Sequence, residues 1–210
     1  MFPSLYAIFD VTAGGEQSVS VSDALADAGV QLMQFRAKHS SSRLIYEQLR
    51  SLIQHLESRS VRVIVNDRPD IASLAGAAGV HVGQDDLPVE DARKICGANR
   101  WVGVSTHNLE QLRVAARTSA DYIAVGPIFP TATKENPDPI VGVELLRAAR
   151  ALTEKPLVAI GGITVESAEQ IFRAGADSVA VIRDLSEARD PGQRAREYLR
   201  IAERVLATRN

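Results

Sequence analysis

Eight short apolar runs, rich in valine and isoleucine, recur along the chain, with longer segments of helical spacing between them. Runs of this length and composition are typical of strands that are buried on both faces. The runs are Leu5 to Phe9, Leu32 to Phe35, Val61 to Val65, Val80 to Val82, Val102 to Val104, Tyr122 to Val125, Leu157 to Ile160 and Val179 to Ile182.

The segments between the runs carry apolar residues three and four positions apart, which predicts helices, as at Leu109, Leu112 and Ala116. Three of these segments end in Ala-Gly, and we expect Gly29, Gly79 and Gly175 to take the left-handed conformation there. Eight strand–helix units in 210 residues predict a (β/α)8 TIM barrel, a single α/β domain over residues 1–210. A doubly wound open sheet is the structural alternative.

Polar clusters follow the second to the seventh of these runs. A closed barrel gathers the carboxyl ends of all its strands around one mouth, whereas an open sheet brings together only those at a switch point. So many clusters therefore favour the barrel. The clusters include Gln34 to Lys38, Asn66-Asp67, Gly83 to Asp86, Ser105 to Asn108, Gly126 to Lys134 and Gly161-Gly162.

The first of these clusters predicts an anion site. Arg36 and Lys38 alternate with Phe35 and Ala37, so the two-residue period of a strand puts both cations on one side. A planar guanidinium beside a mobile ammonium suits a diphosphate. The alternative is a pair of surface cations at the exit of a strand.

Carboxylates follow the next two strands. Asp67 and Asp86 could jointly hold a hard divalent cation such as Mg²⁺. Both segments also resemble helix starts, where carboxylates act as caps, and this alternative suits Asp70 and Asp85 better.

Ser105 ends the fifth run and could face the mouth, while Asn108 is expected to cap the next helix. His107 could transfer protons, although a loop histidine is more often structural or faces solvent. The strand-borne His81 is a weaker candidate still.

The connection from Pro127 to Val141 is rich in proline and predicts a lid over the site, with a plain flexible loop as the alternative. Backbone N–H groups at Gly161-Gly162 could bind phosphate, as this end of a barrel often does. Arg183 could reach that phosphate, or it could pair with Asp184 or Glu187 on the surface.

Composition narrows the class of protein. A formal net charge of −2 argues against nucleic-acid binding, and no apolar run approaches the roughly 20 residues that a membrane-spanning helix needs. Cys96 is the one cysteine, and no signal peptide is recognisable. We therefore expect a cytoplasmic protein that acts on small molecules.

Taken together, the motifs resemble those of the thiamine-phosphate synthase family. They are Gln34-Phe-Arg-Ala-Lys38, Val65-Asn-Asp67, Val80-His-Val-Gly-Gln-Asp-Asp86, Gly103-Val-Ser105, Asp121-Tyr122, Gly126 to Lys134 and Ala159-Ile-Gly-Gly-Ile163. The resemblance runs from about Leu5 to the last helix. It implies a transferase of thiamine biosynthesis that joins 4-amino-2-methyl-5-(diphosphooxymethyl)pyrimidine to 4-methyl-5-(2-phosphooxyethyl)thiazole, or its carboxylated form, and releases diphosphate with Mg²⁺ as cofactor.

The resemblance also implies roles for individual residues. Asp67 and Asp86 would hold Mg²⁺. Arg36, Lys38, Ser105 and Lys134 would be catalytic, and the family mechanism is dissociative, so no protein nucleophile is needed. A homodimer is a further expectation. The residues implied to bind the two substrates are Gln34, Phe35, Arg36, Ala37, Lys38, Asn66, Ser105, Thr131, Ala132, Thr133, Lys134, Gly162, Ile182 and Arg183.

Two positions depart from the family pattern. Ala37 stands where the family often has glutamate, and Arg183 stands where it usually has serine. Arg183 changes the charge at the expected thiazole-phosphate end, which keeps open a non-catalytic barrel that binds a thiamine precursor. A thiazole tautomerase and a phosphate-binding isomerase are the remaining hypotheses for the activity.

Overall fold

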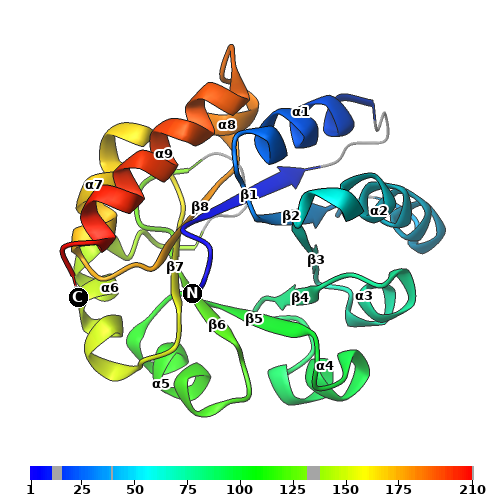
Figure 1. Ribbon diagram of the computed structural model, residues 1–210. Coiled ribbons are helices and arrows are strands. Elements are labelled where there is room, and N and C mark those ends of the chain that lie inside the picture. Colours follow the sequence, from blue (N-terminus) through cyan, green and yellow to red (C-terminus); the bar gives the residue numbers. More distant parts are fainter. Residues whose placement is uncertain (11–15, 39, 132–137, 210) are drawn as a thin grey trace.

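A closed ring of eight parallel strands forms the centre of the protein, and helices surround it (Figure 1). This computed structural model describes residues 1–10, 16–38, 40–131 and 138–209. Neighbours in the ring follow chain order, and β1 closes it by pairing with β8. The strands are β1 (Leu5–Asp10), β2 (Leu32–Arg36), β3 (Arg62–Asn66), β4 (Gly79–Val82), β5 (Trp101–Thr106), β6 (Tyr122–Val125), β7 (Leu157–Ile160) and β8 (Ser178–Val181).

A helix follows each strand and packs over the outside of the ring, which confirms the (β/α)8 barrel (Figure 1). The eight apolar runs all become strands, with ends that shift by no more than two residues. The described helices are α1 (Glu16–Asp27), α2 (Ser42–Leu56), η1 (Glu57–Arg59), α3 (Pro69–Ala75), α4 (Val89–Cys96), α5 (Leu109–Arg117), α6 (Gly142–Leu152), α7 (Val165–Arg173), α8 (Arg183–Ser186) and α9 (Pro191–Leu206).

Two buried clusters form the core. The larger lies between the strands and the helices, and includes Met33, Phe35 and Phe172. The smaller fills the inside of the ring, with Leu32, Ile64 and Val158 among its members. Because successive side chains of a strand point to opposite faces, residues two positions beyond these inward ones face the mouth of the barrel.

Glycine placement confirms two of the three expected helix ends. Gly29 and Gly175 have φ of 96° and 116°, as a glycine after a helix requires. The expectation for Gly79 was wrong, because this residue begins β4 and the left-handed position is Gly76, with φ of 77°. A side chain at Gly79 would collide with the backbone of Trp101 on the next strand, since an added Cβ would lie 2.1 Å from its carbonyl oxygen.

Paired arginine and aspartate side chains tie helices to strands at two places. Asp121 accepts from the backbone N–H of Val102 at 2.7 Å and also from the guanidinium of Arg93. Asp177 repeats the arrangement with Leu157 N at 2.9 Å and Arg150 Nη1 at 2.8 Å. In both pairs the aspartate immediately precedes a strand, so the repeat holds neighbouring strands in register.

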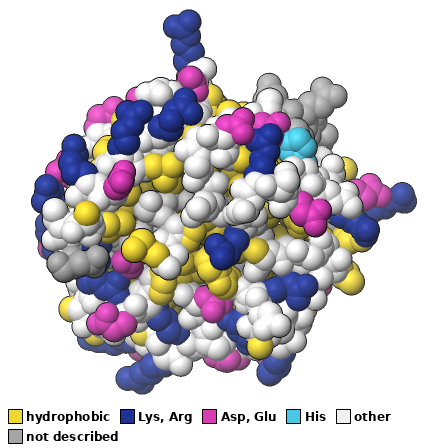
Figure 2. All heavy atoms as spheres, viewed as in Figure 1, with side chains coloured by type: hydrophobic (Ala, Val, Ile, Leu, Met, Phe, Trp, Pro, Cys, Tyr) yellow, Lys and Arg dark blue, Asp and Glu magenta, His cyan; other side chains and the backbone are white. Residues whose placement is uncertain are grey.

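Charged side chains of both signs are mixed over the face that Figure 2 shows, without a continuous basic surface. Within the described ranges, none of the helices is both long enough and apolar enough to span a bilayer.

Candidate active site at the carboxyl ends of the strands

The carboxyl ends of the strands bring most of the expected polar residues to one mouth. Gln34 pairs in register with Ile8 and Ile64, two inward residues of the neighbouring strands, so it faces the inside of the ring. Asn66 pairs with His81 in the same way. Ser105 pairs with Ala124, another inward residue. The register therefore puts polar atoms from four adjacent strands around one space.

Arg36 and Lys38 lie on the mouth side of β2, whereas Phe35 and Ala37, which alternate with them, do not. Phe35 and Ala37 are buried among the residues that separate the strands from the helices. This alternation confirms that Ala37 faces away from the two cations. It also means that Phe35 and Ala37 can offer a ligand only their backbone atoms.

Two carboxylates meet beside these cations. Burial and the neighbouring Asp86 carboxyl raise the pKa of Asp67 to about 6, and the positive charges of Lys38 and Arg36 oppose that rise. Asp86 is held in place by the backbone N–H of Gly83, 2.7 Å from Oδ2. Asp67 has φ of 63°, a left-handed conformation that aspartate tolerates better than most residues.

The paired carboxylates fit a hard cation. Mg²⁺ binds oxygen ligands and commonly uses only one or two carboxylates, with substrate phosphates completing its coordination. In the described part of the chain no three His, Cys, Asp or Glu side chains gather closely enough to form an all-protein metal site. The observation that favours a cation here is that Asp67 and Asp86 repel one another, which costs free energy until a positive charge or a proton lies between them.

Below the mouth, a chain of hydrogen-bonded side chains crosses the inside of the barrel. Gln34 Nε2 lies 2.8 Å from the hydroxyl of Tyr6, and that hydroxyl lies 3.0 Å from the hydroxyl of Tyr122. The hydroxyl of Tyr122 is 3.1 Å from His81 Nδ1, and His81 Nε2 is 2.8 Å from Ser105 Oγ. We name these five residues, Gln34, Tyr6, Tyr122, His81 and Ser105, the lumen chain.

Burial keeps the lumen chain neutral. It lowers the pKa of His81 to about 4, although the charge of Asp86 opposes the change. It also raises the pKa of Tyr6 and of Tyr122. Near neutral pH, each of these three side chains is therefore uncharged.

The segment after β5 serves the architecture. Asn108 caps α5, as expected, by accepting from the backbone N–H of Gln111 at 2.9 Å. His107 Nδ1 lies 2.6 Å from the carbonyl oxygen of Gly126, and its Nε2 is 3.5 Å from Asp138. These contacts join the connections after β5 and β6.

The loops after β6 and β7 lie against each other. Ile128 N donates to Ile160 O at 2.9 Å, and Phe129 N donates to Gly161 O at 3.0 Å. A Cβ added at Gly162 would lie 2.4 Å from the carbonyl oxygen of Pro130, and Gly162 also has φ of 64°. Glycine is therefore required there, and Gly162 is exposed. Thr131 is described, but Ala132, Thr133 and Lys134 lie outside the described residues.

After β8, Arg183 pairs with Glu187, the residue that follows α8, with Nε 2.8 Å from Oε1. Of the two surface partners considered from sequence, Glu187 is the one observed. Asp184 instead accepts from Val165 N at 3.1 Å, from Tyr198 at 2.6 Å and from Arg194 at 3.0 Å. It thus joins the start of α7 to α9, while Ile182 precedes α8.

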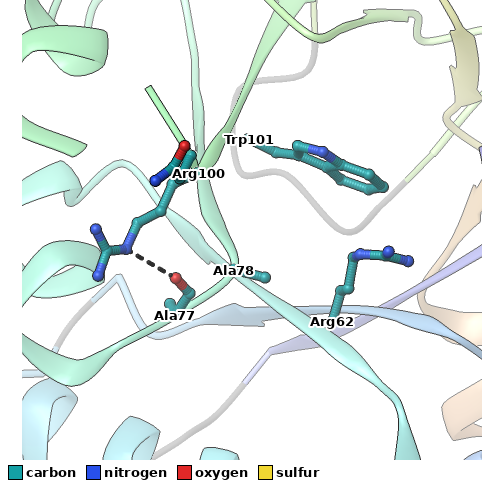
Figure 3. A pocket seen from close by; sticks show the side chains of 6 residues that line it. Arg62, Ala77, Ala78, Arg100 and Trp101 are labelled. Carbon is teal, nitrogen blue, oxygen red and sulfur yellow. Dashed lines mark hydrogen bonds between the residues drawn. The ribbon is translucent and has the colours of Figure 1, made fainter. Parts of the chain in front are cut away.

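A separate pocket of about 380 Å³ opens near the amino ends of β3 and β5 (Figure 3). The guanidinium of Arg62 lies over the ring of Trp101, 4.9 Å from its centroid, and Arg100 Nε donates to Ala77 O at 3.1 Å. Active sites of this fold lie at the opposite end. We therefore assign these contacts to stability.

Sequence reasoning gave no role to Tyr6, named Tyr122 only as part of a family motif, and ranked His81 low. Their signal was present in the two-residue period, since each occupies an inward position of its strand. The pattern could not show which of these side chains meet, because they come from strands that are far apart in the sequence.

Comparison with known families, curated proteins and solved structures identifies relatives of this chain. A family described as "Thiamine monophosphate synthase" matches residues 5–185. A thiamine-phosphate synthase from Koribacter versatilis is 51% identical over 204 residues, covering 95% of each chain. One from Chloroflexus aurantiacus is 42% identical over 194 residues, covering 92% of this chain and 89% of the relative. The solved structure of thiamine phosphate pyrophosphorylase from Pyrococcus furiosus superposes with a TM-score of 0.86 at 33% identity, over 97% of this chain and 96% of that one.

Proposed function

The chain belongs to the thiamine-phosphate synthase family and is a transferase of thiamine biosynthesis, and we propose how its mouth carries out the coupling. The substrates are a pyrimidine diphosphate and a thiazole phosphate, and the products are thiamine phosphate and diphosphate. The observation that carries this proposal is the meeting of Asp67 and Asp86 beside Arg36 and Lys38. Cations and a carboxylate pair are the groups needed to hold a diphosphate with a metal ion.

The pyrimidine diphosphate binds along β2 to β5. Arg36 and Lys38 hold the diphosphate, and Lys134 is proposed to join them. The inward side chains of Gln34, Asn66 and Ser105 contact the ring. Arginine offers two parallel donors to phosphate oxygens and lysine a mobile point charge, so the pair can follow the diphosphate as it departs.

Asp67 and Asp86 would hold Mg²⁺. When bound, the ion would neutralise part of the charge that grows on the departing diphosphate. Arg36 and Lys38 supply the rest of that stabilisation from the protein itself, and they are most effective where water is excluded.

The thiazole phosphate binds at the ends of β6, β7 and β8. Backbone N–H groups near Gly162 and at the start of α8 are proposed to face its phosphate, with Thr131 to Thr133 on the neighbouring loop and Ile182-Arg183 at the strand end. This placement brings the thiazole nitrogen towards the carbon that loses diphosphate. Positioning of this kind accounts for much of the rate when no protein nucleophile takes part.

The test is product formation by the purified protein, given both substrates with Mg²⁺ and, in parallel, with a chelator. We expect thiamine phosphate and diphosphate in equal amounts, and only with the metal. Thiazole isomerisation without coupling would support a tautomerase instead. Binding of the thiazole phosphate in calorimetry without turnover would support a non-catalytic barrel. A homodimer is a further proposal, and sedimentation equilibrium tests it.

A further inference from the structure

The lumen chain has a direction, which follows from the number of hydrogens that each member can donate. Gln34 donates an amide N–H to the hydroxyl of Tyr6. A tyrosine hydroxyl has one hydrogen, and a buried hydroxyl that leaves it unpaired loses a hydrogen bond. The hydrogen of Tyr6 is therefore directed to Tyr122, the other partner of its oxygen.

The same reasoning carries the direction onward. Tyr122 accepts from Tyr6, so it donates its own hydrogen to His81 Nδ1. A neutral imidazole carries one hydrogen, and because Nδ1 accepts, that hydrogen lies on Nε2. His81 then donates to Ser105 Oγ, at 2.8 Å.

Ser105 is the end of the chain. Its oxygen accepts from His81, so its hydroxyl hydrogen is left for a group in the mouth. The backbone carbonyl of Ser105 is fixed separately, because Gln84 Nε2 donates to it at 2.5 Å. Both the position and the hydrogen-bonding sense of Ser105 are thus determined before any ligand arrives.

We propose that Tyr6, Tyr122 and His81 are positioning residues that make Ser105 a hydrogen-bond donor, so that the mouth selects a substrate with an acceptor atom at this point. A ring nitrogen with a lone pair or a phosphate oxygen accepts the Ser105 hydrogen, whereas a substrate N–H at the same point could use only the second lone pair of Oγ and would leave that hydrogen unpaired. The inference rests on the proposed substrate site, because Ser105 must face the pyrimidine diphosphate.

Burial and packing support a selective role over a purely structural one. Tyr6 and Tyr122 are 1% and 0% exposed, and an apolar pair would fill the same space without any need for a hydrogen-bond direction. A buried polar network costs free energy unless all its members are paired. At the end of the chain that faces the mouth, Ser105 Oγ accepts from His81, and the Ser105 hydroxyl hydrogen is directed to no other member of the chain.

The direct test is the tautomer of His81, read by nitrogen NMR on protein with labelled histidine. His81→Gln identifies the signal among the four histidines. We expect a neutral ring with its hydrogen on Nε2 near pH 7, and a mixture of tautomers in Tyr122→Phe. A hydrogen on Nδ1 in the unaltered protein would overturn the proposal, because the chain would then run in reverse. The NMR measurement of the tautomer does not depend on catalytic turnover.

Kinetics provide the second test. Tyr6→Phe and Tyr122→Phe should each raise the KM for the pyrimidine diphosphate about tenfold, as the loss of one directed hydrogen bond implies. The KM for the thiazole phosphate should stay within about twofold. Equal changes in both KM values, or none, would contradict a positioning role. Tyr6→Phe serves alone if Tyr122→Phe does not fold.

Thr106→Val is the matched control. It removes a hydroxyl that is 0% exposed and lies on the same strand as Ser105, but this hydroxyl donates to Ala124 O outside the lumen chain. Its KM values should match those of the unaltered protein. If the unaltered protein forms no thiamine phosphate, the proposed function fails, while the tautomer still reports whether the chain has the inferred direction.

Discussion

Gly103 gives the ring of Tyr122 its place inside the barrel. A Cβ added at Gly103 would lie 2.0 Å from Cζ of that ring, closer than any real contact, and the hydroxyl oxygen is only 2.4 Å away. The two residues are register partners on β5 and β6, so neither can shift without disturbing strand pairing. The missing side chain on one strand thus determines where the lumen chain crosses the barrel.

Gly103→Ala should therefore reduce both stability and activity. Overpacking of a rigid core costs about 1–3 kcal/mol, and displacement of Tyr122 would break its contact with His81. Urea unfolding and the KM for the pyrimidine diphosphate measure the two effects. Gly76→Ala is the control, because its added Cβ meets no atom within 4 Å and only its φ of 77° is strained. It should lower stability by about 1 kcal/mol, the cost of a left-handed conformation for alanine, and leave both KM values unchanged.

His81 predicts a pH dependence of stability. Its pKa is about 4 in the folded protein and 6.5 in the reference state, so the unfolded chain binds more protons between these values. The stability that neutral His81 contributes is present above about pH 6.5 and is lost as the pH falls to about 4, a change of about 3 kcal/mol at most. His81→Gln should lack this loss. Unfolding curves at several pH values provide the comparison, and parallel curves for the two proteins would contradict the prediction.

Asp67 should change the stability with pH in the opposite direction. Its pKa rises to about 6 on folding, so the folded protein binds the extra proton, and the ionised carboxylate destabilises the fold as the pH rises from about 4 to 6. Asp67→Asn keeps the left-handed conformation available and removes the charge. The variant should exceed the unaltered protein in stability by about 1–2 kcal/mol near pH 7, after allowance for partial exposure, and by almost nothing near pH 4.

Mg²⁺ should reverse that order. At neutral pH the ion should raise the melting temperature of the unaltered protein but not of Asp67→Asn, and coupling in the variant should fall about 100-fold or more. Asp85→Asn is a suitable control, since Asp85 is exposed and is not proposed as a ligand. Full activity in Asp67→Asn would remove Asp67 from the metal site.

Substitution of Arg183 should affect the binding of the thiazole phosphate alone. Its side chain is 54% exposed and its guanidinium is held by Glu187, so release from that pair could turn the guanidinium towards the mouth. Arg183→Ser is expected to change the KM for the thiazole phosphate about two- to tenfold, and Glu187→Gln should lower this KM by freeing the guanidinium. An effect confined to the pyrimidine diphosphate would contradict this placement.

Local pattern was enough to predict the ring of strands, because each buried strand is marked by its own apolar run. It also predicted Asn108 as a cap, which depends on residues three apart. It failed at Gly79, where the carbonyl of Trp101, distant in sequence, decides that no side chain can fit. It failed again at Tyr6 and Tyr122, which are 116 residues apart. Pairing across a barrel depends on strand register, which no single segment contains.

The lumen chain takes its members from β1, β2, β4, β5 and β6. A fragment ending after β4 would hold Gln34, Tyr6 and His81 but neither Tyr122 nor Ser105. The complementary fragment would hold only those last two. Neither half of the polypeptide can form the lumen chain beneath the proposed site, so this hydrogen-bonded path exists only when the two halves of the ring come together.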